Sequence, residues 1–185
     1  MKDRFAILIF SLMLSACSHK AQDSRVENSG IATEGFEGSH YTAVQFERGT
    51  SVLDETNKKF LNELAKKASR TGREIDEIKI LAWADREYPQ EGEKSKTRDV
   101  ILANERANVI RKFMKDDLNS NEPFDIFNMA KKPRKIDELF KDEEFQVKED
   151  VADSGVTATR LPTGQTSYTK AGKVLVIIDY KEKNQ

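Results

Sequence analysis

Between Tyr41 and Tyr180, short apolar runs of strand length alternate with longer stretches whose apolar residues recur at helical spacing. A chain of this kind buries its apolar positions by laying helices against a sheet. About 145 residues are enough for one core, so the pattern predicts a single α/β domain, a two-layer sandwich with the order βαβαβ. The runs that predict strands are 41–47, 74–84, 124–128 and 173–180.

The first predicted helix follows the first strand. Thr50 and Ser51 stand where an N-cap belongs, apolar residues recur at helical spacing over 53–68, and Gly72 is a suitable stop. Between the second strand and the second helix, 85–96 is a polar loop with Pro and Gly. Pro133 is expected to open a third helix, and 155–172, rich in Thr, Gly and Ser, predicts a long loop or a small hairpin.

The second predicted helix, 99–117, carries a charge on its apolar side. On a helical wheel, Arg106 falls in the middle of a stripe formed by Leu102, Val109, Ile110 and Phe113. A guanidinium in such a position needs a partner, because stranding its charge costs several kcal/mol. We expect Arg106 to reach a partly open cleft.

Asp85 is the natural partner, since it directly follows an apolar strand, and strand ends deliver side chains into clefts. An acid and a base held on rigid elements either neutralise each other as a structural ion pair or grip a zwitterion end to end. The residues themselves leave both interpretations open. Trp83, inside the apolar run, is expected to pack between strand and helix rather than to stack on a sugar.

The opening run 1–17 has a charged start, an apolar stretch too short to span a bilayer, and small residues before Cys17, the only cysteine. This pattern resembles a bacterial lipoprotein signal. The resemblance implies cleavage after residue 16 and acylation of Cys17, whose two or more acyl chains would anchor the protein stably. An ordinary secretory peptide and an uncleaved anchor are the alternatives. Ser18, next to Cys17, implies the outer membrane by the same resemblance.

The segment 18–40 is polar and poor in branched apolar residues, so it predicts a flexible tether. The expected organisation is therefore a signal peptide over 1–16, lipidated Cys17 with its tether over 17–40, and a folded domain over 41–185 with an inserted loop at about 155–172. The domain would face the periplasm.

Composition excludes several classes of function. With 31 basic and 32 acidic residues the net charge is −1, which disfavours nucleic-acid binding. Once Cys17 carries lipid, no thiol is left for a disulfide or a zinc site. The two histidines, His19 and His40, lie in or beside the tether, and no motif of a nucleophile, metal or nucleotide site occurs. We therefore expect a protein without catalysis, cofactor or metal.

The residues Ala84-Asp85, followed by the segment Leu102-Ala103-Asn104-Glu105-Arg106-Ala107 and Val109, resemble the signature of the OmpA-like peptidoglycan-associated domain. The resemblance covers about 41–180. It implies a mixed four-stranded sheet with helices on one face. It also implies that Asp85 accepts the ammonium, and Arg106 binds the carboxylate, of diaminopimelate in the peptide stem.

Asp99 stands where that family carries Asn at the opening of the helix, so it is expected to hold the loop over the site or only to cap the helix. Other positions depart from the family: Ala84 replaces its Thr, Ala103 replaces its Ser, and Ala171-Gly172-Lys173 replaces Asn-Arg-Arg before the last strand.

Three functions follow as hypotheses. The first is an outer-membrane lipoprotein that binds peptidoglycan noncovalently and links the membrane to the wall. The second is a structural or protein-interaction subunit of an envelope assembly, whose pocket is degenerate; the long loop after Asp85 and the insert at 155–172 motivate it. The third and weakest is a wall-active hydrolase.

Overall fold

The computed structural model describes residues 38–87, 89, 93–132, 146–148, 151, 159–160, 166–167 and 169–182. The leader, Cys17, most of the tether and the expected third helix at Pro133 lie outside this part of the chain, as does much of 155–172.

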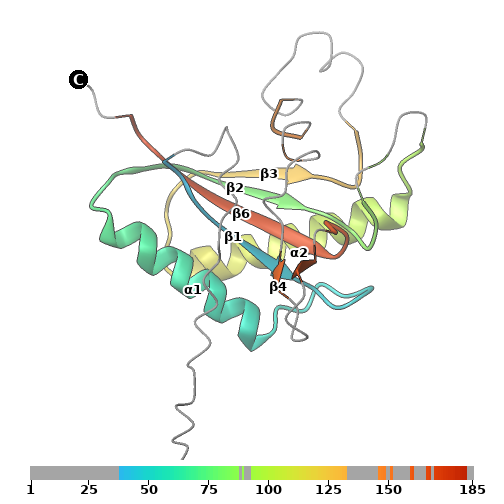
Figure 1. Ribbon diagram of the computed structural model, residues 1–185, viewed down its shortest axis with the longest axis horizontal. Coiled ribbons are helices and arrows are strands. Elements are labelled where there is room, and N and C mark those ends of the chain that lie inside the picture. The colour runs from blue at the N-terminus through green and yellow to red at the C-terminus, as the bar shows by residue number, and fades with distance from the viewer. Residues whose placement is uncertain are drawn as a thin grey trace, which may run out of the picture.

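Four strands form one mixed sheet in the order β1-β6-β2-β3, as Figure 1 shows. They are β1 (His40–Gln45), β2 (Ile75–Ala82), β3 (Phe124–Asn128) and β6 (Lys173–Tyr180). The last strand, β6, lies in the interior of the sheet and runs antiparallel to both β1 and β2, whereas β3 runs parallel to β2. The apolar runs predicted all four strands, two of them with these bounds.

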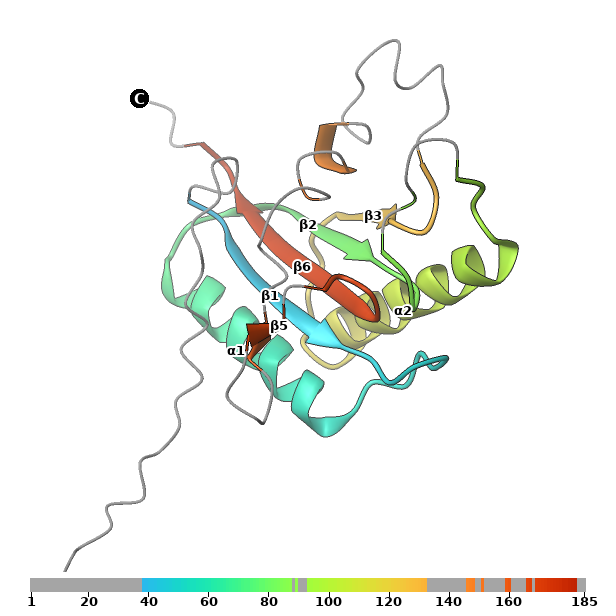
Figure 2. The same ribbon diagram turned by 45° about the vertical axis from the view of Figure 1, so that its right-hand side comes forward.

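Two long helices, α1 (Glu55–Arg70) and α2 (Thr97–Asp116), pack on the same face of this sheet (Figures 1 and 2). Helix α1 lies on β1, and α2 lies on β2 and β3. The apolar core between the layers joins both helices to alternate residues of the strands, among them Val44, Leu61, Leu64, Ile80, Ile110, Met114, Val174 and Val176. The α/β class, the βαβαβ order and the two-layer arrangement are thus confirmed.

A second apolar cluster covers part of the opposite face of the sheet. Trp83 is fully buried there, so it packs away from α1 and α2 and not between them and the sheet. The reason is strand alternation, because Leu81 and Trp83 share one face while Ala82 and Ala84 face the helices. Val147, in a helical turn at 146–148, and Val151 cover this cluster (Figure 2). Within the expected insert, β4 (Thr159–Arg160) and β5 (Thr166–Ser167) pair antiparallel, as in a hairpin.

Helix α1 begins later than the sequence predicted. Its N-cap is Asp54, whose Oδ1 accepts a hydrogen bond of 2.7 Å from the backbone N–H of Asn57, so Thr50 and Ser51 are not the cap. The residues before Asp54 carry the chain from the end of β1 to the start of the helix. The helix stops as predicted, with Gly72 in the left-handed region at φ 62°.

Helix α2 presents a different face to the sheet from the stripe that the large apolar residues indicated. Its buried residues are Leu102, Ala103, Arg106, Ala107, Ile110 and Met114, whereas Val109 and Phe113 are only half buried. Small Ala103 and Ala107 face the sheet, which lets the helix approach closely. Arg106 nevertheless lies on the buried side, as predicted.

Candidate functional site

The candidate site lies at the end of the sheet where β1 and β2 finish and β6 begins. Pairing continues past the strand ends: the N–H of Trp83 donates to the Lys173 carbonyl at 3.0 Å, and the N–H of Gly172 donates to the Ala84 carbonyl at 2.6 Å. These bonds fix the backbone up to Asp85, the next residue. The turn 47–50 after β1 also reaches it, through the backbone N–H of Gly49.

Asp85 is held by two donors from different elements. Its Oδ1 accepts a bond of 2.7 Å from Nη2 of Arg106, and its Oδ2 accepts one of 2.6 Å from the backbone N–H of Gly49. The side chain keeps 18% of its surface exposed. The carboxylate therefore has a fixed orientation, and part of it still faces solvent.

Arg106 is completely buried, with 0% of its surface exposed. Besides Asp85, its guanidinium donates to three backbone carbonyls: Nε to Thr50 at 2.8 Å, Nη1 to Trp83 at 2.9 Å, and Nη2 to Glu47 at 3.1 Å. It also lies 5.3 Å from the centre of the Phe46 ring. Four of the five N–H donors of a guanidinium are thus engaged within the chain.

This geometry corrects the expectation that Arg106 reaches a partly open cleft. The backbone carbonyls of the turn 47–50 and of Trp83 surround the guanidinium and satisfy its charge, so it needs no opening to solvent. Asp85 and Arg106 do meet, as the sequence indicated. They meet in direct contact, and no ligand fits between them in this arrangement.

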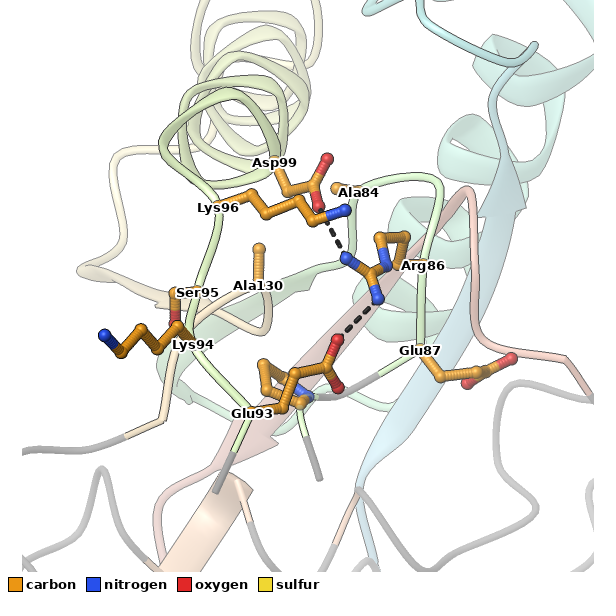
Figure 3. A pocket seen from close by; sticks show the side chains of 10 residues that line it. Ala84, Arg86, Glu87, Glu93, Lys94, Ser95, Lys96, Asp99 and Ala130 are labelled. Carbon is orange, nitrogen blue, oxygen red and sulfur yellow. Dashed lines mark hydrogen bonds and ion pairs between the residues drawn. The ribbon is translucent and has the colours of Figure 1, made fainter. Parts of the chain in front are cut away.

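Asp99 borders a neighbouring small pocket, which Asp85 and Arg106 do not line (Figure 3). In this pocket the Arg86 guanidinium lies between two carboxylates, with Nη2 at 2.5 Å from Glu93 and Nη1 at 3.9 Å from Asp99. The N-cap of α2 is Lys96, which makes no side-chain capping bond, and Asp99 lies in the first turn. The cavity has a volume of about 10 Å³, which is room for one water.

Two supporting residues were missed by the sequence analysis. Gly49 adopts φ 74°, a conformation that favours glycine, and it supplies the N–H that orients Asp85. Glu87 accepts bonds from Thr169 and from the backbone N–H groups of Lys170 and Ala171, at 2.8 and 3.3 Å, and so fixes the turn into β6. The Arg48-Gly49-Thr50 sequence between strand and helix was a turn signal that could have identified the first of them.

The charge at the start of β6 is unusual. Lys173 is fully buried, and loss of hydration lowers the pKa of its ammonium group to about 8, although nearby Glu87 acts in the opposite direction. This lysine therefore titrates well below an ordinary lysine.

The described residues also bear on the expectations about His40, a metal site and membrane-spanning helices. His40 opens β1 at the far end of the sheet, with Nδ1 at 3.0 Å from the Tyr180 hydroxyl, so it takes no part in the site. Within the described ranges, no three His, Cys, Asp or Glu side chains gather as a metal ion would require. None of the helices described there has the length and apolar character needed to cross a bilayer.

Solved structures similar to this chain include two bacterial domains. One is the OmpA-like domain of FopA1 from Francisella tularensis, with 13% identity, coverage of 79% of this chain and 77% of that chain, and a TM-score of 0.44. The other is the periplasmic domain of Helicobacter pylori MotB, with 11% identity, coverage of 83% and 87%, and a TM-score of 0.43. No protein-family model and no curated protein matches the sequence. Because both TM-scores are below 0.5, nothing about the function of this chain follows from these likenesses.

Proposed function

We propose that this chain is a noncatalytic lipoprotein of the outer membrane that binds peptidoglycan and so links the membrane to the cell wall. The binding surface is the exposed surface of Asp85 beside the turn 47–50, and the expected ligand is the free end of diaminopimelate in the peptide stem. The sequence resemblance to OmpA-like domains motivates the ligand. The observation that carries the proposal is the carboxylate of Asp85, oriented by Gly49 and Arg106 and still 18% exposed.

In this proposal Asp85 accepts the ligand's ammonium group. A carboxylate whose position is already fixed by two donors loses little freedom when it binds a third, so it is a preorganised acceptor. Its placement at the end of a buried strand, between two loops, keeps the site on a rigid support. Binding at one such site need not be tight, because many anchored copies facing one polymer gain avidity.

Arg106 acts as a positioning residue in this proposal, since its donors are engaged and its surface is buried. It joins the turn 47–50, the end of β2 and Asp85 in one hydrogen-bonded unit. Asp99 is proposed to act in the same indirect way, by drawing Arg86 toward the start of α2. Arg106 and Asp99 would thus shape the surface around Asp85 without contacting the ligand themselves.

Sedimentation with isolated sacculi tests the proposal. The full chain, purified in mild detergent, is mixed with sacculi and centrifuged, and the bound fraction is measured over a range of sacculus concentrations. We expect retention of the parent and its loss in Asp85→Asn. Asp76→Asn is the matched control, because Asp76 is an exposed aspartate on the same strand, at the far end from the site. Equal retention of both variants would refute the role of Asp85.

The lipid anchor is tested separately. Cells grown with labelled palmitate should incorporate the label into the parent and not into Cys17→Ser, and only the parent should fractionate with the outer membrane. A Cys17→Ser chain that still carries palmitate would contradict the proposed acylation site.

A second candidate is a structural subunit of an envelope assembly with a closed pocket. The direct contact of Arg106 with Asp85, and a neighbouring cavity of only about 10 Å³, favour it. In this case the parent would not sediment with sacculi. Release of soluble wall fragments over time would instead indicate a hydrolase.

A further inference from the structure

We propose that the edge of β3 and the adjoining side of α2 form a second binding surface, which takes up an acidic, extended segment of a partner protein as an added strand. None of its residues belongs to the site around Asp85, so the inference goes beyond the proposed function and does not depend on it. Three features support it: a groove between α2 and β3, cations along that groove, and backbone groups of β3 that point away from the sheet.

The groove lies between the second half of α2 and the start of β3, and its volume is about 640 Å³. The helix residues that line it are three or four positions apart, so they form one stripe along α2. The lining residues are Asn108, Arg111, Lys112, Lys115, Asp116 and Phe124. A volume of this size is typical of ligand-binding clefts, whereas the pocket beside Asp99 has room for one water.

Three cations lie along this stripe. The side chains of Arg111, Lys112 and Lys115 are exposed, and none of them makes a hydrogen bond or an ion pair with the described residues. Asp116 is the single anion among the lining residues, so three cations against one anion give the groove a formal charge of +2. The whole chain, by contrast, has a net charge of −1. The groove therefore attracts an acidic ligand.

β3 is an edge strand of the sheet (Figures 1 and 2). The N–H of Met129 donates to β2 at 2.9 Å, and the carbonyl of Pro123 accepts a bond of the same length from β2. Because backbone groups alternate in direction along a strand, the N–H and C=O groups of Phe124 and Ile126 point away from β2. They have no partner among the described residues. This side of β3 can therefore pair with another strand.

The other edge of the sheet is partly closed. Asn57 accepts a bond of 3.3 Å from the N–H of Gln45 and donates one of 2.8 Å to the Gln45 carbonyl, so a side chain occupies the end of β1. On β3, Asn128 is buried, and it donates to the Val100 carbonyl at 2.8 Å, which fastens the end of the strand to α2. The open part of the β3 edge is thus the part beside the three cations.

An acidic strand fits both parts of this surface. Its backbone would pair with Phe124 and Ile126, and every second side chain would point to the side of the sheet on which α2 lies. Carboxylates at these positions would meet the cations of α2. A phospholipid headgroup is also anionic, but it has no backbone that could pair with a strand. A polypeptide is therefore the occupant that uses every feature of the surface.

The experiment measures binding of labelled peptides to the full chain in nonionic detergent by fluorescence anisotropy. One peptide alternates glutamate with threonine over nine residues, and in a second peptide glutamine replaces each glutamate. We expect the acidic peptide to bind roughly tenfold more tightly, the scale of three exposed ion pairs. A variant that combines Arg111→Gln, Lys112→Gln and Lys115→Gln should lose this preference.

The matched control combines Lys66→Gln, Lys67→Gln and Arg70→Gln. These exposed residues of α1 are of the same types as the three cations of α2 and have the same spacing. The control variant should keep the preference for the acidic peptide. Circular dichroism verifies that both variants, with changes at exposed positions only, are folded.

Two N-methylated forms of the acidic peptide test the backbone pairing. Methylation of the glutamates removes the N–H groups on one side of the added strand, and methylation of the threonines removes those on the other side. We expect one form to lose binding and the other to keep it, because only one side of the added strand faces β3.

Several outcomes would overturn the proposal. These are equal affinity of the parent for the acidic and the glutamine peptide, a preference that persists in the α2 variant, and a preference that is lost in the α1 control. Equal binding of the two methylated forms would exclude an added strand. Binding of phosphatidylglycerol vesicles through the three cations, without binding of the acidic peptide, would assign the surface to lipid instead. Sedimentation with sacculi is a separate measurement, so these outcomes leave the proposed function intact.

Discussion

Replacing Arg106 by Met removes the residue that joins the loops of the site to the sheet. Met fills a similar volume without a charge, so the change leaves no large cavity. It does remove four hydrogen bonds at once: those to the carbonyls of Glu47, Thr50 and Trp83, and that to Asp85. The loss of these donors is the main energetic effect that we expect.

The magnitude follows from how accessible each acceptor is. The bond to the Trp83 carbonyl is buried, and an unsatisfied buried acceptor costs about 1 to 3 kcal/mol. The other three bonds are partly buried, so water replaces part of each, and about 0.5 to 1 kcal/mol is lost per bond. Together, Arg106→Met should lower the free energy of unfolding by about 2.5 to 6 kcal/mol, which is a large share of typical domain stability.

Urea unfolding of the full chain in detergent, followed by tryptophan fluorescence and circular dichroism, measures this loss. A decrease of this size corresponds to a melting temperature lower by about 5 to 24 °C. Arg111→Met is the matched control, since Arg111 is an exposed arginine on the same helix, and it should cost less than about 0.5 kcal/mol. A loss below about 1 kcal/mol in Arg106→Met would refute the role of its hydrogen bonds.

A double-mutant cycle distinguishes the ion pair from the carbonyl bonds. Asp85→Asn alone should cost only about 1 kcal/mol, because Asp85 is partly exposed and Gly49 still contacts it. The double variant should stay nearly as unstable as Arg106→Met, because the three carbonyls still lack their donor. If Asp85→Asn lowered the free energy of unfolding as much as Arg106→Met, the ion pair and not the carbonyl bonds would account for the loss.

Two further predictions concern the start of β6. Gly172→Ala should destabilise by about 2 to 3 kcal/mol in urea unfolding, since φ is 78° and a Cβ would lie 2.5 Å from Nε2 of Gln45, so that the Gln45 side chain would give up its bonds to the Phe46 and Gly172 carbonyls. Gly72→Ala, at φ 62° with no atom within 4 Å, should cost only about 1 kcal/mol, and equal losses in the two variants would contradict this reasoning. Between pH 8, near the pKa of Lys173 in the folded protein, and pH 10.5, near its ordinary pKa, the unfolded chain binds more protons than the folded one. The free energy of unfolding should therefore rise with pH in this range, and Lys173→Met should lack this rise. Equal slopes of the free energy against pH in the parent and the variant would contradict the prediction.

The sequence alone was sufficient for the secondary structure wherever periodicity was strong. The bounds of β3 and β6 were predicted to the residue, because dense β-branched and aromatic runs have few other uses. The start of α1 was misplaced, since Thr50, Ser51 and Asp54 are all competent caps. Thr50 belongs to the turn 47–50, which is closed by a bond of 3.1 Å from the Thr50 N–H to the Glu47 carbonyl. This turn lies before the helix, so Asp54 is the N-cap.

The two faces of the sheet were harder to predict. A continuous apolar run does not say which of its residues face the helices, so Trp83 was assigned to the wrong side of β2. Likewise, the large apolar residues of α2 suggested Val109 and Phe113 for the centre of the contact, whereas Ala103 and Ala107 occupy it. Close approach between a helix and a sheet depends on small residues, which a hydrophobicity pattern weighs lightly.

For the candidate site, the sequence by itself determined that Arg106 needs a partner, because a charge on an apolar helix face demands one, and it indicated Asp85 at the end of the apolar strand. Only the tertiary structure decided how: the carbonyls of Glu47, Thr50 and Trp83 come from segments far apart in the chain and converge on one guanidinium. Backbone acceptors carry no signature in the sequence. Their convergence buries Arg106 and leaves Asp85 partly exposed.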